Sequence, residues 1–318
     1  MIHAKFDRRA IPQAATLSMQ TMADGWPVRR FDWPAAGEPR GRILFQGGRG
    51  DFIEKYLETF AHWQARGWSI TGFDWRGQAG SGRLGSDPKV GHIEHFSDWI
   101  DDLATFHDGW IRERPGPHVV MGHSMGGHLV LRALIEKRIA PDAVVLSAPM
   151  LGFDTAPWPL ALVAWGARLI ANRGPLDRKA WKENEKPSGP WNARISYLTS
   201  DSARYSDELW WRRHNPVLDV GPPSWQWLLE AYASTIATAA PGGLEGVAQP
   251  ILIVGTDGDK LVSPQAIRRF AARLPDAEMT MFDTSVKHEV LRECDAVRDK
   301  AIALIDDFLA RKAPASRP

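Results

Sequence analysis

The chain has 318 residues, of which 44% are hydrophobic and 24% are charged, and these ordinary globular proportions exclude a disordered, collagenous or coiled-coil protein. Its net charge is only +1 and no long run carries one sign, so nucleic acid is not an expected partner. The one cysteine, Cys294, excludes an intrachain disulfide and a cysteine-based zinc site, and we expect it to be a buried thiol on the last helix.

The first predicted elements are two strands, at 16–22 and 26–33, because an Asp-Gly pair between strand-like runs is a hairpin signal. Short apolar runs bounded by Gly or Pro follow. Their apolar character is continuous rather than alternating, which is typical of parallel strands covered on both faces. These runs lie at 42–46, 68–73, 118–122, 143–147, 250–255 and 278–282.

Helical patterns lie between the strand runs. Trp99, Leu103, Phe106 and Trp110 follow one another at steps of four, three and four, with Ser97 as the expected N-cap. Further helices are predicted at 129–137 and over the final segment from about residue 297. The alternation of strand and helix indicates an α/β fold, with a mostly parallel central sheet flanked by helices.

This alternation stops near Pro149 and resumes near Pro250. We therefore predict one α/β core, residues 1–150 and 249–318, interrupted by an insertion of short helices at 151–248. The insertion contains eight of the 15 tryptophans of the chain. This composition indicates that the insertion has a different role from the core.

The clearest chemical signal lies between the third parallel strand run and the helix after it. There, Gly122-His123-Ser124-Met125-Gly126 has the G-x-S-x-G pattern of a nucleophile elbow. In such an elbow the serine takes a strained backbone that presents its hydroxyl, and small residues two positions away prevent clashes. The alternative, a chance pentapeptide in a loop, does not account for the flanking strand and helix. Ser124 is therefore the predicted nucleophile.

A serine hydroxyl needs a general base, and the base needs an acid to orient it. His288 lies in the loop after the last strand run, and imidazole exchanges protons near neutral pH. Two acids, Asp257 and Asp259, follow the 250–255 run. We predict Asp259, which starts a D-x-x-V pattern, and the alternative for Asp257 is a turn-forming role. The order Ser, Asp, His is the one that α/β-hydrolases use.

A tetrahedral intermediate also needs backbone N–H donors aimed at its oxyanion. One donor should be the amide of Met125, directly after the nucleophile. The other should come from the glycine-rich loop at 47–51, because glycine lets the backbone approach a substrate closely.

Together these segments resemble the serine-hydrolase branch that contains bacterial lysophospholipases and monoacylglycerol lipases. The resemblance covers about residues 16–311, and in this register Gly47-Gly48 stands where the family has His-Gly. Arg49 would then supply the second oxyanion amide, with Gly48 as the alternative. The segments that carry the resemblance are 47–56, 74–81, 122–126, 259–262 and 287–291.

In that family an insertion at this place forms a cap that shapes the acyl pocket, and a Trp-rich cap suits an apolar wall. The resemblance therefore implies that Trp158 and Trp165 bind substrate, together with Gly48 and His123. The stretch 158–170 could be an amphipathic helix that touches a membrane while delivering a lipid, or a helix packed over the core. Five basic residues could meet a phosphate head group or form a solvated surface: Arg194, Arg204, Arg212, Arg213 and His214.

The function implied by the resemblance is hydrolysis of a carboxylic ester through an acyl-enzyme, as in a lysophospholipase or monoacylglycerol lipase. The expected partner is a small-molecule lipid ester, and no cofactor or metal is expected. The protein should be cytoplasmic and could be peripheral to the membrane, because no apolar stretch is long enough to span a bilayer.

Two other functions remain open. A non-catalytic ligand-binding protein can share the fold, since fold does not imply function. A serine aminopeptidase or amidase would need an acidic site for the substrate amine. The candidate acids for such a site are Glu183, Glu185, Asp201, Asp207 and Glu208.

Overall fold

The computed structural model describes residues 6–181 and 193–315. Two of the candidate acids, Glu183 and Glu185, lie outside these residues. Trp191, one of the eight tryptophans of the insertion, lies outside them as well.

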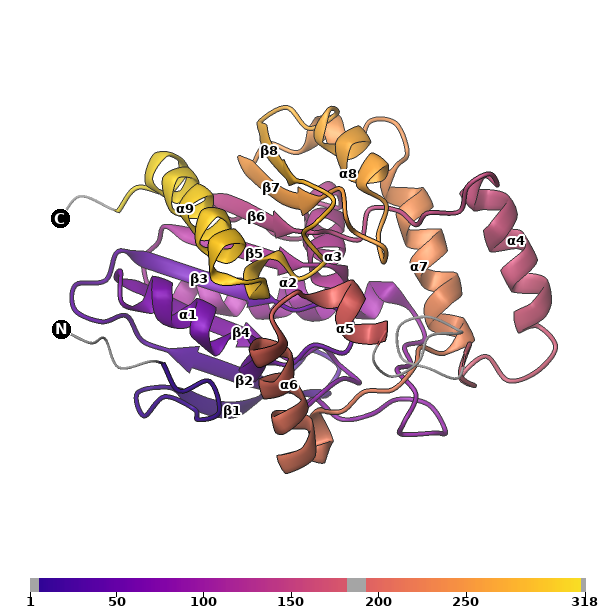
Figure 1. Cartoon of the computed structure of the whole chain (residues 1–318), viewed down its shortest axis with the longest axis horizontal. Helices are drawn as coiled ribbons and strands as arrows, with labels where there is room; N and C mark the ends of the chain where they lie inside the picture. Colours follow the sequence, from indigo (N-terminus) through magenta and orange to yellow (C-terminus); the bar gives the residue numbers. More distant parts are fainter. Residues whose placement is uncertain (1–5, 182–192, 316–318) are drawn as a thin grey trace.

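One eight-stranded sheet forms the middle layer of the molecule, with the strand order β1-β2-β4-β3-β5-β6-β7-β8 (Figure 1). β1 (Thr16–Thr21) and β2 (Pro27–Trp33) form the predicted antiparallel hairpin. Its turn contains Gly25 at a φ of +88°, a conformation that glycine adopts without strain. β2 pairs antiparallel with β4. The other neighbouring pairs of the sheet are parallel, namely β4–β3, β3–β5, β5–β6, β6–β7 and β7–β8.

All six runs predicted as parallel strands are confirmed, and their ends differ from the prediction by at most one residue. Neighbouring strand residues pack on opposite faces of the sheet. On β5, for example, Val120 contacts one hydrophobic cluster, whereas Val119 and Met121 belong to the other. The strands are β3 (Gly41–Gln46), β4 (Trp68–Phe73), β5 (His118–His123), β6 (Ala143–Ser147), β7 (Ile251–Thr256) and β8 (Ala277–Phe282).

Helices cover both faces of this sheet (Figure 1). One hydrophobic cluster joins the sheet to η1 (Ile53–Tyr56), α1 (Leu57–Gln64) and α9 (Asp295–Lys312). The other cluster joins it to α2 (Phe96–Glu113), α3 (Met125–Ile135) and α8 (Pro264–Ala271). Because both faces are covered, the strands are apolar along their whole length.

Three expectations about helix ends were wrong. α2 begins at Phe96 with His95 as its N-cap, so Ser97 lies inside the first turn. α3 begins at Met125, four residues before the prediction, because tertiary contacts override the low helix propensity of Gly126 and Gly127. Cys294 precedes α9 as its N-cap and is exposed, not buried within the helix.

Between β6 and β7 the chain forms mainly short helices, as the composition of residues 151–248 predicted. α7 packs against α4 and also against α2 and α3, while α6 packs against η1. The insertion therefore contacts the core at two separate places. Its elements are α4 (Leu160–Ala171), α5 (Ala193–Leu198), α6 (Ser202–His214), η2 (Pro216–Leu218), α7 (Trp225–Thr238) and η3 (Leu244–Gly246).

Candidate active site

Ser124 occupies the junction between β5 and α3, and its backbone has φ 52° and ψ −119°. This conformation is uncommon for a residue with a side chain, so neighbouring structure must hold it. The Ser124 N–H donates to the carbonyl of Ser147 at the end of β6 (2.9 Å), and the Ser124 carbonyl accepts from the N–H of Met150 (2.9 Å). The end of β6 and the segment after it thus hold the peptide groups on both sides of the Ser124 Cα.

The two glycines of the pentapeptide are required by close packing. A Cβ added to Gly126 would lie 2.4 Å from the Gly47 carbonyl oxygen and 2.5 Å from that of Gln46. A Cβ added to Gly122 would lie 2.7 Å from the backbone of Gly127. The start of α3 therefore rests directly on the loop after β3, and a side chain at Gly126 would separate them. A side chain at Gly122 would instead push the start of α3 away from β5.

His288 joins Ser124 to a carboxylate. Its Nε2 lies 2.9 Å from Ser124 Oγ, and its Nδ1 lies 2.5 Å from Asp259 Oδ2. The imidazole is buried, with 3% of the residue exposed. The three side chains come from the loops after β5, β7 and β8, at the carboxyl end of the sheet, and they form one continuous hydrogen-bonded chain.

The two candidate acids have different surroundings. Asp259 is buried, and its Oδ1 accepts the N–H groups of Leu261 and Val262 (2.8 and 3.0 Å), which orients the other oxygen toward His288. Asp257 is exposed and binds the guanidinium of Arg268 instead, which lowers the pKa of the Asp257 carboxyl. The D-x-x-V spacing thus corresponds to a turn whose amides hold the carboxylate.

The glycine-rich loop after β3 packs against the serine. A Cβ added to Gly48 would lie 2.9 Å from Ser124 Cβ, so glycine is required for this approach. The Gly48 N–H donates to Asp51 Oδ2 (2.7 Å) within the loop, and Trp75 Nε1 donates to the Gly47 carbonyl (2.8 Å). The Gly48 amide is therefore directed at the loop itself, away from a substrate bound at Ser124.

A cavity of about 190 Å³ opens above the serine. Of the residues predicted to form the site, it is lined by Gly48, Arg49, His123, Ser124, Met125 and His288, while Asp259 lies behind His288.

Sequence reasoning did not identify the apolar wall of this cavity. The wall comes from α7 and from the segments that leave β6 and β7, and its principal residues are Met150, Phe153, Trp227, Leu228, Tyr232 and Val262. The tryptophan-rich composition of the insertion was the signal, but it did not distinguish Trp227 from the others.

Trp158 and Trp165, which the resemblance implies bind substrate, do not lie at this cavity. Trp158 precedes α4 and Trp165 lies on it, and both are 61% exposed. Neither borders the cavity, because α4 packs against the outer side of α7 and α7 supplies the wall. In Figure 1 α4 lies at the edge of the molecule, beyond α7 from the sheet.

His123, the residue before the nucleophile, is buried between His288 and the ion pairs of the β3 loop. Its ring centroid lies 4.9 Å from that of His288. Burial and the neighbouring His288 lower the pKa of His123 to about 4. His123 is therefore neutral over the physiological pH range and adds no charge beside the base.

Comparison with known proteins identifies the family. The sequence profile of the family described as serine aminopeptidase S33 matches residues 37–295, which is most of the chain. The chain belongs to this family.

Relatives and structural neighbours of the chain include proteins named as ester hydrolases. The chain is 30% identical over 304 residues to lysophospholipase L2 of Escherichia coli strain K12, covering 92% of this chain and 86% of the relative. A soluble variant of monoglyceride lipase from Saccharomyces cerevisiae, in complex with a substrate analogue, superposes with a TM-score of 0.77 at 17% identity over 98% of this chain and 99% of that one. A carboxyl esterase from Bacillus coagulans gives 0.74 at 14% identity over 95% and 99%. The resemblance to the lysophospholipase and monoacylglycerol lipase branch of the α/β hydrolases is confirmed.

The S33 description includes aminopeptidases, which need an acid to bind the substrate amine. Among the described acids of the insertion, Asp201 caps α6, Asp207 binds Arg8 and Arg9, and Glu208 binds Arg194. None of these three acids borders the cavity. Within residues 6–181 and 193–315, no group of three His, Cys, Asp or Glu side chains is arranged to hold a metal ion.

The basic residues of the insertion contact the protein itself. Arg204 binds Glu58 of α1 (2.7 Å) and the carbonyl of Glu293 (2.6 Å). Arg212 donates to the Gly50 carbonyl (3.0 Å) and also binds Asp219. Arg204 and Arg212 therefore fasten α6 to the core, a role that was not considered from the sequence. Of the other three basic residues, Arg213 and His214 are exposed, as on a solvated surface, and Arg194 borders the cavity. Along the described parts of the chain, no helix has both the length and the apolar character needed to cross a membrane.

Substitution of Gly126 by Ala tests the packing of the elbow. The added Cβ would push α3 away from the loop after β3, so we expect a loss of about 1–3 kcal/mol in the free energy of unfolding. Gly109→Ala is the matched control, because Gly109 also lies in a helix and its Cβ would meet nothing within 4 Å. That change should stabilise the protein by about 0.5–1 kcal/mol. Equal effects in urea denaturation would contradict the packing argument.

Proposed function

We propose that this protein is a serine hydrolase that cleaves carboxylic esters of single-chain lipids, with Ser124 as nucleophile, His288 as general base and Asp259 as the acid that orients it. One observation carries the proposal, namely the hydrogen-bonded chain from Ser124 through His288 to Asp259 beneath a cavity with an apolar wall. This is the constellation that activates a serine hydroxyl in acyl transfer.

The mechanism follows from the order of donors and acceptors. Asp259 accepts the Nδ1 proton of His288, so Nε2 carries a lone pair toward Ser124 Oγ. As Oγ attacks the ester carbonyl, its proton passes to Nε2, and the imidazolium then gives this proton to the leaving alcohol as the C–O bond breaks. A water molecule attacks the resulting acyl-serine by the same route, which releases the fatty acid and restores the Ser124 hydroxyl.

The oxyanion formed in each attack needs two N–H donors. We assign the Met125 amide, which follows Ser124 at the start of α3, as one donor. For the other we favour Arg49 over Gly48, since the Gly48 N–H already donates to Asp51. Arg49 borders the cavity, and its guanidinium binds the Gly221 carbonyl (3.1 Å) and lies over the Trp227 ring.

The substrate class rests on the cavity wall and on the relatives. Phe153, Trp227, Leu228 and Tyr232 offer an apolar surface that a fatty acyl chain would bury. The relatives whose names state an activity include a lysophospholipase and a monoglyceride lipase. A lysophospholipid or a monoacylglycerol accordingly fits both lines of support.

We further propose that residues 151–248 act as a cap over the core and that α4 touches the lipid surface from which the substrate comes. Trp158, Leu162, Trp165, Leu169 and Ile170 are each at least 45% exposed. Between residues 155 and 176 the only charged side chains are those of Arg168 and Arg173. An exposed apolar stripe with basic residues beside it suits an anionic lipid surface.

Ser124→Ala tests the nucleophile. We expect turnover of a long-chain monoacylglycerol to fall at least about a thousandfold, because the change removes the hydroxyl that lies 2.9 Å from His288 Nε2. Labelling by a fluorophosphonate should also disappear, while near-ultraviolet circular dichroism stays that of the wild type. Retention of wild-type turnover would refute the assignment. In the wild type, faster cleavage of aminoacyl arylamides than of acyl esters would instead favour the aminopeptidase function.

A pair of Asp→Asn variants tests the choice of acid. Asp259→Asn should lower kcat by roughly three to four orders of magnitude, since an amide cannot stabilise the imidazolium and can favour the wrong tautomer. Asp257→Asn removes a charge from the same loop but only breaks an exposed pair with Arg268, so kcat should stay within about twofold. Similar losses in both variants, measured on one soluble ester, would overturn the assignment.

The double variant Trp158→Gln and Trp165→Gln tests the lipid contact. Binding to phosphatidylglycerol vesicles in a sedimentation assay should weaken by about tenfold, because two exposed rings no longer enter the interface. Turnover of a monomeric ester should not change, since neither ring borders the cavity. Met19→Gln on β1, at a side chain that is 56% exposed, is the control and should bind as the wild type does. Unchanged vesicle binding of the double variant would exclude this role for α4.

A further inference from the structure

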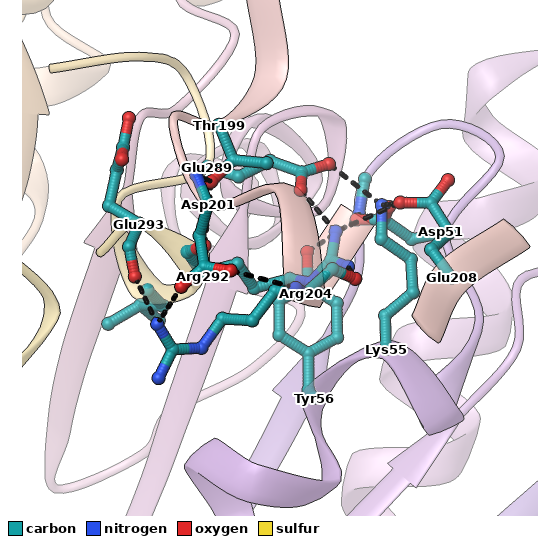
Figure 2. A network of polar contacts seen from close by, with 12 residues as sticks. Asp51, Lys55, Tyr56, Thr199, Asp201, Arg204, Glu208, Glu289, Arg292 and Glu293 are labelled. Atoms are coloured by element: carbon teal, nitrogen blue, oxygen red, sulfur yellow. Dashed lines mark hydrogen bonds and ion pairs between the residues drawn. The ribbon is translucent and has the colours of Figure 1, made fainter. Parts of the chain in front are cut away.

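A buried cluster of charges lies beside the active site, where α6 of the cap meets the core (Figure 2). We call it the Lys55 cluster, and its members are Asp51, Lys55, Glu208, Glu289 and Arg292. No side chain in it is more than 6% exposed. Burying so many charges is costly unless each is paired, so the cluster needs an explanation.

Lys55 binds one carboxylate from each of three separate segments. Its Nζ contacts Asp51 of the loop after β3, lies 2.8 Å from Glu289 beside His288, and lies 3.3 Å from Glu208 of α6. Arg292 completes the cluster, since it binds both Glu208 (2.9 Å) and Glu289. A single ammonium group thus links two loops of the active site to the cap.

The Asp51 end of the cluster holds the oxyanion loop. Asp51 Oδ2 accepts the Gly48 N–H and the Tyr56 hydroxyl, each at 2.7 Å, while Oδ1 binds Lys55. Gly48 in turn packs against Ser124. A shift of the Asp51 carboxylate would therefore move the loop that carries the proposed Arg49 amide.

The other end of the cluster holds the loop of the base. The His288 and Glu289 N–H groups donate to the carbonyls of Tyr197 (3.2 Å) and Leu198 (2.7 Å) at the end of α5. Arg292 donates to the Arg204 carbonyl (2.7 Å). The α5 and α6 segments therefore hold the loop that carries His288 through these hydrogen bonds. Glu208 of α6 adds an ion pair with Arg292 of the same loop.

The charges of the cluster persist at neutral pH. Burial raises the pKa of Glu289, but Arg292 and Lys55 together lower this pKa by more than burial raises it, so the net shift is downward. Arg194 and Lys55 likewise outweigh burial and bring the pKa of Glu208 well below its ordinary value. For Lys55, burial lowers the pKa, and the surrounding carboxylates more than compensate. Loss of Glu208 would leave Lys55 and Arg292 buried with one opposing charge fewer, and their remaining ion pairs would have to readjust.

We propose that Lys55 and Glu208 are positioning residues, which set His288 and the oxyanion loop relative to Ser124 from the cap side. The inference rests on the proposed function. Glu208 carries it most directly, because this side chain does not border the cavity. It can influence the reaction only through the cations that it binds, which are Lys55, Arg194, Arg212 and Arg292, and through the residues they hold.

The test compares Glu208→Gln with Asp102→Asn. Both changes remove one charge from a buried carboxylate that binds arginine. Asp102 lies on α2 and pairs with Arg76 of the loop after β4, outside the cluster. For Glu208→Gln we expect kcat on a soluble ester and the second-order rate of fluorophosphonate labelling to fall together by about tenfold. KM should stay within about twofold, and Glu208→Asp, which keeps the charge, should recover part of the loss. Asp102→Asn should keep kcat within about twofold, although its Tm falls.

Three results would decide the matter. A wild type that fluorophosphonate does not label would overturn the proposed function and this inference with it. Labelling of wild type and Glu208→Gln at equal rates, in folded protein, would overturn the inference alone. If Glu208→Gln does not fold, Thr199→Val replaces it, because Thr199 Oγ1 donates to the Arg292 carbonyl (2.8 Å) and its loss should lower the labelling rate a few-fold. An unchanged rate in that variant would equally overturn the inference.

Discussion

At Ser124 the chain ends a strand and begins a helix within one residue, with a positive φ that only the surrounding hydrogen bonds and glycine contacts can maintain. The other parts of the site are arranged around this backbone. The start of α3 touches the loop after β3 because Gly126 has no side chain, and the same loop reaches Ser124 because Gly48 has none. Catalytic geometry in this protein is therefore first a matter of backbone packing, and polar side chains are added to it.

The order of the strands in the sheet brings Asp259 and His288 close to Ser124. β5, β6, β7 and β8 are neighbours, so the loops after β5, β7 and β8 open at one edge although their residues are far apart in sequence. The sequence was informative here because each buried strand leaves a continuous apolar run, and because Ser124, Asp259 and His288 each follow such a run. Helix ends were predicted less well, since Gly126 and Gly127 suggest a loop until the packing that requires them is known.

Sequence patterns could not reveal the Lys55 cluster or the position of α4 outside the cavity. Asp51, Glu208 and Glu289 share no spacing, and the basic residues of α6 have the same appearance in the sequence as a solvated surface or a head-group site. Their actual role depends on α6 lying against η1, which no local pattern specifies. Likewise, the tryptophans near α4 and those of α7 have similar compositional surroundings, yet only α7 faces the cavity. Tertiary arrangement decides which apolar residues line the cavity and which remain exposed.

Cys294 is placed where a chemical label can reach it. It is exposed, and it is the one cysteine in the chain. It follows Glu293 on the loop that is hydrogen-bonded to α5 and α6. A thiol-reactive fluorophore or spin label would consequently attach at a single site, six residues after the imidazole of His288. The protein thus carries a natural spectroscopic reporter on the segment between the loop of His288 and α9.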